Sequence, residues 1–557
     1  MKRGKRRKRA ENGEIKRIYL RLALIAIGAG LVYLLLPLPH RTPQGESSQE
    51  SREESDPGTN QGKAVFGPEE KIYRIGSGTL DTEKGQYALK MPVTLWINGE
   101  KSEEAAGNFL AGKKAALTLD EQGAVTDIAV RGQIETPEKV RVLLSSGEDA
   151  YEHGQLTLSC DGDFWALWDG EIITYPAGSK VTVAWKEGKI SRRACFYAAS
   201  EKSLFTVVSD GAGTHSYYGS LEIFPGEAGF CLINEVDTET YLCGVVPSEM
   251  PESYGLEAAK AQAVCARSYV CSQWKKSVKY AAWGAHVDNT VNSQCYGGAV
   301  GKETARQAVE ETWGQVLTFQ EEIIPANYFS TSCGWTAAAA DVWEGKENMT
   351  YLSSRPQYTE GEYGDLSREE DFHAFITDTQ VKAYDQSSRW FRWTARIRCD
   401  QVREGLEAWL AGAGPVKVLE GEFFEEKELK SVGEVEDFYV YTRAESGLAT
   451  SMLIVGTEAS VKVEGSQTIR KILAAADITL SNGEKIGQRS LLPSAFISLE
   501  KIKDASGKLT SVKICGGGYG HGAGLSQTGV KGMTELGYTY QEILAHYYEG
   551  TELTDLP

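Results

Sequence analysis

The pattern of hydrophobic and polar positions changes its period several times along the chain. From Ile72 onward, short apolar–polar alternations are broken by Gly and Asn, as in VTLWING (93–99) and VRVLLSS (140–146). Alternation with period two, with turn residues between the runs, predicts strands joined by hairpins. We therefore expect two β-rich modules, at 66–136 and 137–215, with packing, spacing or partner binding as their role.

The longest helical pattern lies at 255–274, after a strand-like stretch at 217–246. Within it, apolar residues recur at helical spacing: Leu256, Ala259, Ala263, Ala266 and Val270. A stripe of such small residues predicts a helix packed closely against a neighbouring element.

Two further helices are predicted, at 301–314 and 539–548. The second begins with the capping box Thr539 to Glu542, in which each residue satisfies a free backbone N–H of the first turn. Strands and helices alternate without a regular βαβ repeat, and this favours an α+β fold over a doubly wound sheet.

The N-terminal segment has a different pattern. Ile18 to Leu38 is apolar apart from Arg21, which is long enough for a membrane-spanning helix. Ten Lys/Arg and two Glu occupy the first 21 residues. This bias predicts a cytoplasmic tail (1–17), a transmembrane helix (18–38) and an external remainder. A cleaved signal peptide is the alternative, but no small-x-small cleavage site follows the apolar run.

Composition and charge narrow the function. Residues 39–65 are polar, acidic and poor in apolar side chains, as in a disordered linker. The whole chain carries a formal net charge of −18. Because an acidic surface repels phosphate polyanions, we expect no nucleic-acid partner. The ten Cys form no CxxC pattern, and their redox state is left open.

The first candidate for chemistry is Glu249, in the stretch GVVPSEMPES (244–253). Its position before the predicted helix favours a capping role through the helix dipole. The flanking prolines and apolar neighbours favour the alternative, because an apolar setting disfavours the charged form of a carboxyl, as a general acid requires.

The second candidate is the polar group of the 255–274 helix, namely Gln262, Arg267 and Tyr269. An amide on an alanine-packed helix needs a partner, which would be a backbone group or a ligand. For Arg267 the alternative is a structural pair with a nearby carboxylate.

Two further polar clusters follow. Ser330 and Ser332 lie in the hydroxyl-rich stretch NYFSTSCGWT (327–336), which has neither a GxSxG elbow nor an SxxK motif. Such loops more often bind backbone or a sugar than act as nucleophiles. His521, Ser526 and Gln527 lie in GGGYGHGAGLSQTG (516–529), which is not a P-loop. A lone His is a weak metal signal and a better candidate for binding a ligand or orienting a carboxyl.

The order and wording of these stretches closely resemble the SpoIID/LytB family, the stage II sporulation protein D and amidase-enhancer group. The resemblance runs from about Val140 to Leu553 and is clearest from Tyr217 onward. It implies a catalytic domain at 216–557 and a bacterial, membrane-anchored lytic transglycosylase that cleaves the MurNAc–GlcNAc bond of peptidoglycan, with spore engulfment as its expected setting. The Glu of the family's EMP motif corresponds to Glu249, with the other clusters as substrate-binding residues.

The resemblance also carries an expectation about metals. Some members bind zinc through one His and two Cys ahead of a CQVY segment, where this chain has AHVDNTVNSQCY (285–296). Val287 and Ser293 stand at the cysteine positions, so we expect no zinc and no other cofactor. Expected partners are glycan strands, a cell-wall amidase and other engulfment proteins. The competing functions are a non-catalytic enhancer of an amidase and a purely structural envelope protein.

Overall fold

The structure, a computed structural model, describes residues 68–556 apart from 135, 148–149, 169, 186–192, 210, 277, 359 and 488. The expected tail (1–17), transmembrane helix (18–38) and linker (39–65) lie outside these residues. Within the described part of the chain, no helix is both long and apolar enough to cross a bilayer. The fold mixes α and β and is rich in strands, which confirms the coarse expectation.

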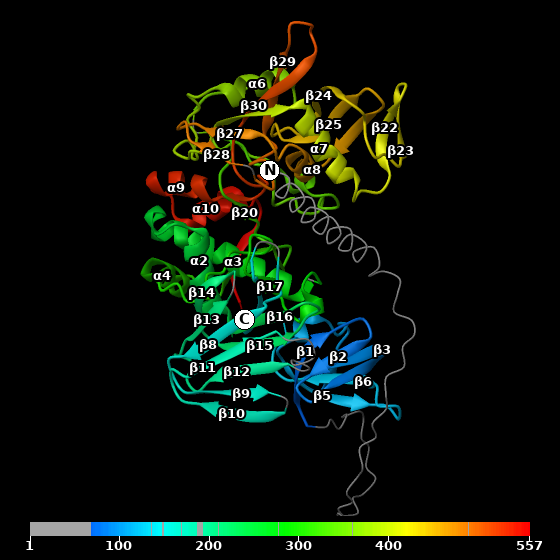
Figure 1. Ribbon diagram of the computed structural model, residues 1–557. Coiled ribbons are helices and arrows are strands. Elements are labelled where there is room, and N and C mark those ends of the chain that lie inside the picture. Colours follow the sequence, from blue (N-terminus) through cyan, green and yellow to red (C-terminus); the bar gives the residue numbers. More distant parts are fainter. Residues whose placement is uncertain are drawn as a thin grey trace, which may run out of the picture.

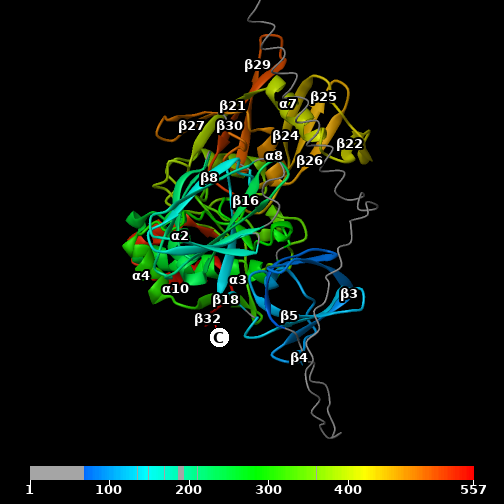
Figure 2. The same cartoon turned by 60° about the horizontal axis from the view of Figure 1, so that its bottom comes forward.

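The first body is a six-stranded sheet with its own core. Its strands run in the order β2-β1-β5-β6-β3-β4, and an additional pairing of β2 with β3 closes the sheet on itself. The strands are β1 (Glu70–Ile75), β2 (Thr79–Thr82), β3 (Gln86–Ile97), β4 (Glu100–Lys101), β5 (Lys114–Leu119) and β6 (Val125–Val130). Figure 2 shows this module beside the rest of the molecule, and its core includes Trp274, which belongs to a helix outside it.

Two stacked sheets follow and share one core. The seven-stranded sheet has the order β10-β9-β12-β15-β16-β7-β17, and the four-stranded sheet has the order β11-β8-β13-β14. The larger sheet consists of β7 (Lys139–Leu144), β9 (Phe164–Trp168), β10 (Glu171–Tyr175), β12 (Ala194–Ala198), β15 (Ser220–Pro225), β16 (Phe230–Asp237) and β17 (Val287–Asp288). The smaller consists of β8 (Gln155–Cys160), β11 (Lys180–Ala184), β13 (Phe205–Ser209) and β14 (Gly213–Tyr217).

A layer of helices covers these sheets (Figure 1). This layer consists of α2 (Thr238–Glu249), α3 (Leu256–Lys276) and α4 (Glu303–Glu311). Helices α9 (Gln527–Glu535) and α10 (Tyr540–Tyr547) pack against α3 in a separate core. Short strands join them: β18 (Gln315–Phe319), β19 (Glu322–Ile323), β20 (Tyr328–Phe329), β31 (Leu525–Ser526) and β32 (Glu552–Asp555). The predicted helices at 255–274, 301–314 and 539–548 are confirmed, and both bonds of the Thr539–Glu542 capping box are present.

A second lobe stands between β20 and β31 in the sequence and lies beyond α9 and α10 in Figure 1. Its helices are α5 (Ala339–Val342), α6 (Glu369–Thr377), α7 (Cys399–Leu410) and α8 (Ser466–Ile472). One sheet contains β21 (Trp393–Arg398), β27 (Asp477–Leu480), β28 (Lys485–Ile486), β29 (Ile497–Lys503) and β30 (Leu509–Gly516). The other contains β22 (Val416–Glu420), β23 (Phe423–Lys427), β24 (Val435–Arg443), β25 (Ala449–Gly456) and β26 (Ser460–Glu464).

One predicted element is wrong. The strand-like pattern was expected to continue to Val246, but the chain turns at Asp237 into helix α2. The Asp237 carboxylate accepts a hydrogen bond from the N–H of Thr240 and caps the new helix. Alternating β-branched and aromatic residues gave the strand signal, and the capping bond with burial of Tyr241, Leu242 and Val245 outweighs it.

Candidate active site

Glu249 is the last residue of α2, not a cap of α3. Pro247 lies inside the last turn, and the hydroxyl of Ser248 donates to the carbonyl of Gly244, 2.8 Å away. A helix C-terminus presents carbonyl groups, which do not stabilise a carboxylate. The capping interpretation of Glu249 is therefore wrong, and its partners come from elsewhere in the fold.

Two N–H donors hold the half-buried Glu249 carboxyl. The backbone N–H of Cys295 donates to Oε1 at 2.7 Å, and the amide nitrogen of Gln527 donates to Oε2 at 3.2 Å. Cys295 is half-buried next to this carboxylate, and its partial burial together with the Glu249 charge raises the pKa of its thiol to about 12. The thiol is therefore protonated at neutral pH and serves as a further donor toward Glu249.

Gln262 lies buried behind the site and carries a donor without a partner. Its side chain is fully buried on α3, and its Oε1 lies 3.5 Å from the amide nitrogen of Gln527. Among the described residues, nothing accepts a hydrogen bond from its own buried Nε2. A buried N–H without a partner is costly, but this nitrogen is enclosed and offers no surface to a ligand, so the prediction that Gln262 contacts substrate is corrected.

Tyrosines line the region behind the carboxyl. The hydroxyl of Tyr328 donates to Oε1 of Gln294 at 3.1 Å, and the amide of Gln294 donates to the Tyr241 hydroxyl at 3.3 Å. Burial and the nearby Glu249 charge raise the pKa of Tyr328 well above its ordinary value. Tyr269 belongs to the same region through Ser293, and burial raises its pKa to about 12. These phenols are neutral donors throughout the physiological range.

The third and fourth predicted clusters meet through a short parallel ladder. Strand β20 pairs with β31, so that Tyr328 lies opposite Leu525 and Phe329 opposite Ser526. The ladder brings the loop of Ser330 and Ser332 to the start of α9, where Gln527 reaches Glu249. Ser330 is partly exposed, and its carbonyl accepts from the N–H of Thr528 at 2.9 Å.

A buried carboxylate, Asp385, binds the ends of this ladder. It accepts hydrogen bonds from the Ser332 backbone N–H at 2.9 Å, from the Ser332 hydroxyl at 2.7 Å and from the Ser526 hydroxyl. Ser332 and Ser526 are 1% and 0% exposed, so the prediction that they contact substrate is corrected to a structural role. Burial raises the pKa of Asp385 to about 6, although the serine bonds oppose the rise.

Arg267 is also structural. It is fully buried, and its guanidinium binds both carboxylate oxygens of Glu239 at 2.7 and 2.6 Å and the carbonyl of Gln315 at 3.0 Å. Glu239 lies in the first turn of α2 and Glu249 ends the helix, about 15 Å away along its axis. The prediction that Arg267 binds substrate is corrected, and the alternative of a buried ion pair is confirmed.

His521 holds two backbone segments in place. Its Nδ1 accepts from the N–H of Ala523 at 3.2 Å, so Nε2 carries the proton and donates to the carbonyl of Tyr328 at 3.0 Å. Burial lowers the pKa of His521 to about 4, which keeps the ring neutral between Phe329 and Trp343. Since both nitrogens are occupied, the prediction that it binds a ligand or orients the carboxyl is corrected.

Several residues of the site carried no sequence signal that singled them out. Cys295 acts through its backbone N–H, which every residue except proline has. Gln294 and Tyr241 are polar side chains in stretches without other catalytic signals. Asp385 lies in a segment without a recognisable motif. Only spatial proximity to Glu249 or to Ser526 distinguishes these residues.

The family model for SpoIID, the stage II sporulation protein, matches residues 227–319, which contain α2, α3, Glu249, Gln262 and Cys295. The chain carries a SpoIID domain. A second model, for a domain of unknown function (DUF8618), matches residues 337–524 and so covers the inserted lobe and the glycine-rich loop of His521. Ser526 and Gln527 follow both matches, so the site is completed by the C-terminal segment.

Three relatives align with the chain beyond the SpoIID match. The amidase enhancer of Bacillus subtilis is 31% identical over 322 residues, covering 56% of this chain but only 40% of its own length. Stage II sporulation protein D of the same organism is 26% identical over 337 residues, covering 58% of this chain and 76% of its own length. An uncharacterized protein of Brachyspira hyodysenteriae is 25% identical over 422 residues, covering 75% of this chain and 93% of its own length.

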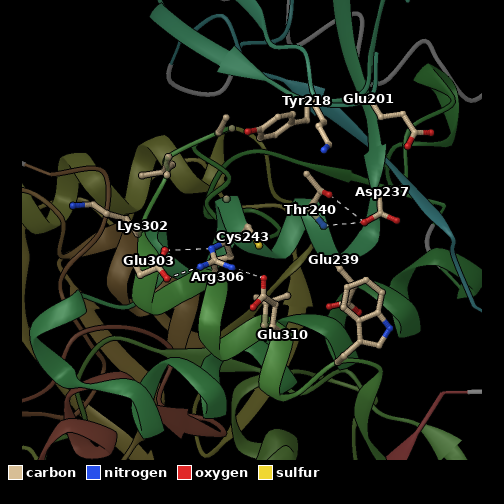
Figure 3. Close-up of a pocket in the computed structure, with 18 residues that line it drawn as sticks. Glu201, Tyr218, Asp237, Glu239, Thr240, Cys243, Lys302, Glu303, Arg306 and Glu310 are labelled. Carbon is tan, nitrogen blue, oxygen red and sulfur yellow. Dashed lines mark hydrogen bonds and ion pairs between the residues drawn. The ribbon is translucent and has the colours of Figure 1, made fainter. Parts of the chain in front are cut away.

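A large hollow of the SpoIID domain lies on another face of α2, between α2 and α4 (Figure 3). It has a volume of about 600 Å³ and includes Asp237, Cys243 and the exposed Trp313. Arg306 spans Glu303 and Glu310 across its floor. None of the predicted site residues lines it.

The segment 285–296, which corresponds to the zinc-binding loop of some SpoIID-like proteins, has other roles here. His286 is buried, its Nδ1 accepts from the N–H of Arg141 at 3.2 Å, and burial lowers its pKa to about 3. Cys295 lies beside Glu249. Within the described residues, no three His, Cys, Asp or Glu side chains are grouped as metal ligands.

Proposed function

We propose that this protein is a peptidoglycan lytic transglycosylase that cleaves the β-1,4 bond between N-acetylmuramic acid and N-acetylglucosamine, with Glu249 as its general acid and base. The segment 18–38 would anchor it in the bacterial cell membrane, with the SpoIID domain on the wall side. Spore engulfment is the proposed setting, in keeping with the name of the stage II sporulation protein D relative.

One observation carries the proposal. The Glu249 carboxyl is half-buried and is held by the Cys295 N–H and the Gln527 amide. A carboxyl that is held in place and partly exposed can deliver a proton to the leaving oxygen of a bound glycan.

The chemistry requires a single carboxyl. Protonated Glu249 donates its proton to the glycosidic oxygen as the bond from C1 to that oxygen breaks. The resulting carboxylate then takes the proton of the C6 hydroxyl as O6 bonds to C1, which closes the 1,6-anhydro ring and restores the acid. No water is consumed, in contrast to the two-carboxylate hydrolases.

The surroundings suit such a reaction. Asp288 is the other carboxylate whose charge acts on Cys295, but it is fully buried and accepts from the hydroxyls of Tyr151 and Thr290. It therefore does not serve as a second catalytic acid. The remaining groups near Glu249 are amides and phenols, which recognise an uncharged glycan without adding charge.

A matched pair of variants tests the proposal. Glu249→Gln keeps the shape of the side chain but removes its proton, and we expect it to abolish release of soluble fragments from purified glycan strands that lack stem peptides. Glu252→Gln is the control, because Glu252 follows Glu249 by three residues and its exposed carboxylate pairs with Lys302. It should retain wild-type activity. Fragment release by Glu249→Gln at the wild-type rate would reject the proposal.

A second candidate function is non-catalytic enhancement of a cell-wall amidase. It is supported by the relative named amidase enhancer, which has the highest identity of the three relatives described above. This function predicts that Glu249→Gln still binds glycan and still stimulates an amidase in trans, while wild-type protein alone releases nothing. Adding a purified amidase to the two variants therefore separates the two functions.

A further inference from the structure

A second cavity lies at the junction of the N-terminal module and the stacked sheets. This junction pocket has a volume of about 530 Å³, within the range of small-ligand sites. Its walls come from β1 and β5 of the module and from β7, β9, β12 and β16 of the larger sheet. Glu249 is not among its residues, so the pocket is separate from the proposed active site.

The pocket is cationic in a chain that is strongly acidic. Six basic side chains line it against four acidic ones, whereas the chain as a whole carries −18. The basic residues are Lys71, Lys113, Lys114, Arg131, Lys139 and Arg141. The hollow between α2 and α4 is the opposite case, with three basic and five acidic side chains.

Two of the lysines are forced together by the sheet. Lys71 on β1 is the direct cross-strand partner of Lys114 on β5. Like charges opposite each other in an antiparallel pair repel, and both of these line the pocket. Within the described part of the chain, no ion pair includes Lys114 or Lys139. Their charges are therefore open to an incoming anion.

The floor of the pocket holds an excess of buried positive charge. Arg141, which is 1% exposed, binds Glu235 at 2.6 Å and Glu222 at 3.0 Å. Arg193 also pairs with Glu222, and Lys71, which is 9% exposed, donates to Glu235 at 2.8 Å. Among the described residues, three cations thus share two carboxylates.

The pKa shifts of Glu235 and Arg193 agree with this excess of cations over carboxylates. Burial acts to raise the pKa of Glu235, but the charges of Lys71 and Arg141 hold it down at about 2. Burial and the charge of Arg141 lower the pKa of Arg193 to about 10. An uncompensated buried charge is costly, so an anion above Lys71 would stabilise this arrangement.

The pocket also has room and an apolar wall. Gly112, at a φ of +90°, lies over the floor, where a Cβ would come within 3.1 Å of Arg141 and Glu235. Trp165 and Tyr197 stack with ring centroids 4.3 Å apart and line the same pocket. An aromatic face beside a cationic floor suits a sugar ring that carries a negative group.

We propose that the junction pocket is a binding site for a phosphate- or carboxylate-bearing saccharide. The anionic group lies on Lys71, Lys114 and Lys139, and the ring lies against Trp165. A phosphodiester wall polymer and the lactyl carboxylate of muramic acid share this chemistry. The site would hold the protein on the wall independently of Glu249.

Calorimetric titration of the full chain at constant ionic strength tests this proposal. The charged probes are glucose 1-phosphate and N-acetylmuramic acid, and the neutral controls are glucose and N-acetylglucosamine. At least one charged probe should bind saturably and the neutral sugars should not. Preference for glucose 1-phosphate would indicate phosphate polymers, and preference for N-acetylmuramic acid would indicate peptidoglycan.

Variants locate the binding. Lys114→Gln with Lys139→Gln changes two exposed residues and should weaken binding about tenfold. The matched control, Lys202→Gln with Lys302→Gln on the α2–α4 hollow, should bind as the wild type does. Glu249→Gln should also bind normally, which separates this proposal from the proposed function. Failure of both charged probes to bind, equal binding of neutral sugars, or equal loss in the control would overturn it.

Discussion

The residues around Glu249 divide into those that are partly exposed and those that hold others in place. Glu249 and Gln527 are partly exposed, and the Gln527 amide donates to the Glu249 carboxyl. His521, Ser526 and Asp385 act on backbone and on each other. Residue type did not separate the two groups in the sequence, because hydroxyl and imidazole groups serve both purposes.

His521 makes stability dependent on pH. Its pKa is about 4 in the fold and 6.5 in the unfolded chain, because burial disfavours the charged ring. As pH falls, the unfolded chain binds the proton first, so the stabilisation present above pH 6.5 is lost toward pH 4. His521→Gln keeps an N–H donor but does not titrate there. Its loss of unfolding free energy between pH 7 and 4 should be smaller by about 2 kcal/mol.

Urea unfolding at a series of pH values measures this difference. His215→Gln is the matched control, because His215 lies exposed on β14 and bonds only the nearby carbonyl of Ala212. The control should follow the wild-type curve. Identical pH dependence of His521→Gln and the wild type would contradict the assigned role.

Asp385 is expected to position Gln527. Asp385→Ala leaves the hydroxyls of Ser332 and Ser526 without their acceptor, which should cost about 3 kcal/mol of unfolding free energy. It should also lower kcat more than it changes KM, since α9 begins at Gln527. Asp385→Asn retains an acceptor oxygen and should restore part of both. Equal defects in the two variants would argue against a positioning role.

At the scale of elements, the site depends on α2 packing very closely against the loop that carries Cys295. Gly244 has no Cβ, and one placed there would lie 2.3 Å from the carbonyl oxygen of Gly298 and 2.6 Å from the Tyr296 ring. The approach brings the Cys295 N–H to Glu249 at the end of the same helix.

Gly244→Ala should therefore separate α2 from this loop. We expect a loss of about 1–3 kcal/mol in unfolding free energy, as for other overpacked sites, together with reduced glycan cleavage. Gly414→Ala is the control, since a Cβ there meets nothing within 4 Å. Thermal and urea unfolding of the two variants check the prediction, and an unaffected Gly244→Ala would disprove the close approach.

An element can be predicted from the sequence when its signal is local, and it is missed when its stability comes from packing. The α3 helix was recognisable because its apolar stripe has a clear period, and α10 because its capping box is a local signal. Helix α2 was missed because its residues have strand propensity and its stability comes from the Asp237 cap and burial. Because the sequence does not predict α2, it also does not predict that Glu249 lies at the end of a helix.

At the scale of the whole molecule, sequence periodicity did not reveal which elements share a core. The sequence predicts one catalytic domain over 216–557, and the structure contains a separate core within that stretch, built from residues between Trp390 and Ile514. Hydrophobic patterning is local and is the same whichever partner an element packs against. The parallel pairing of β20 with β31, about 200 residues apart, was equally invisible in the sequence.

The central claim is that Glu249 breaks the glycan without water. Purified glycan strands incubated with the full chain in ¹⁸O-labelled water, followed by mass spectrometry of the fragments, test it most directly. We predict anhydro-ended fragments that contain no ¹⁸O, and no such fragments with Glu249→Gln. Incorporation of ¹⁸O at the new ends would indicate hydrolysis and would contradict the account. Wild-type protein that stimulates an amidase but releases no fragments itself would indicate an enhancer and would also contradict it.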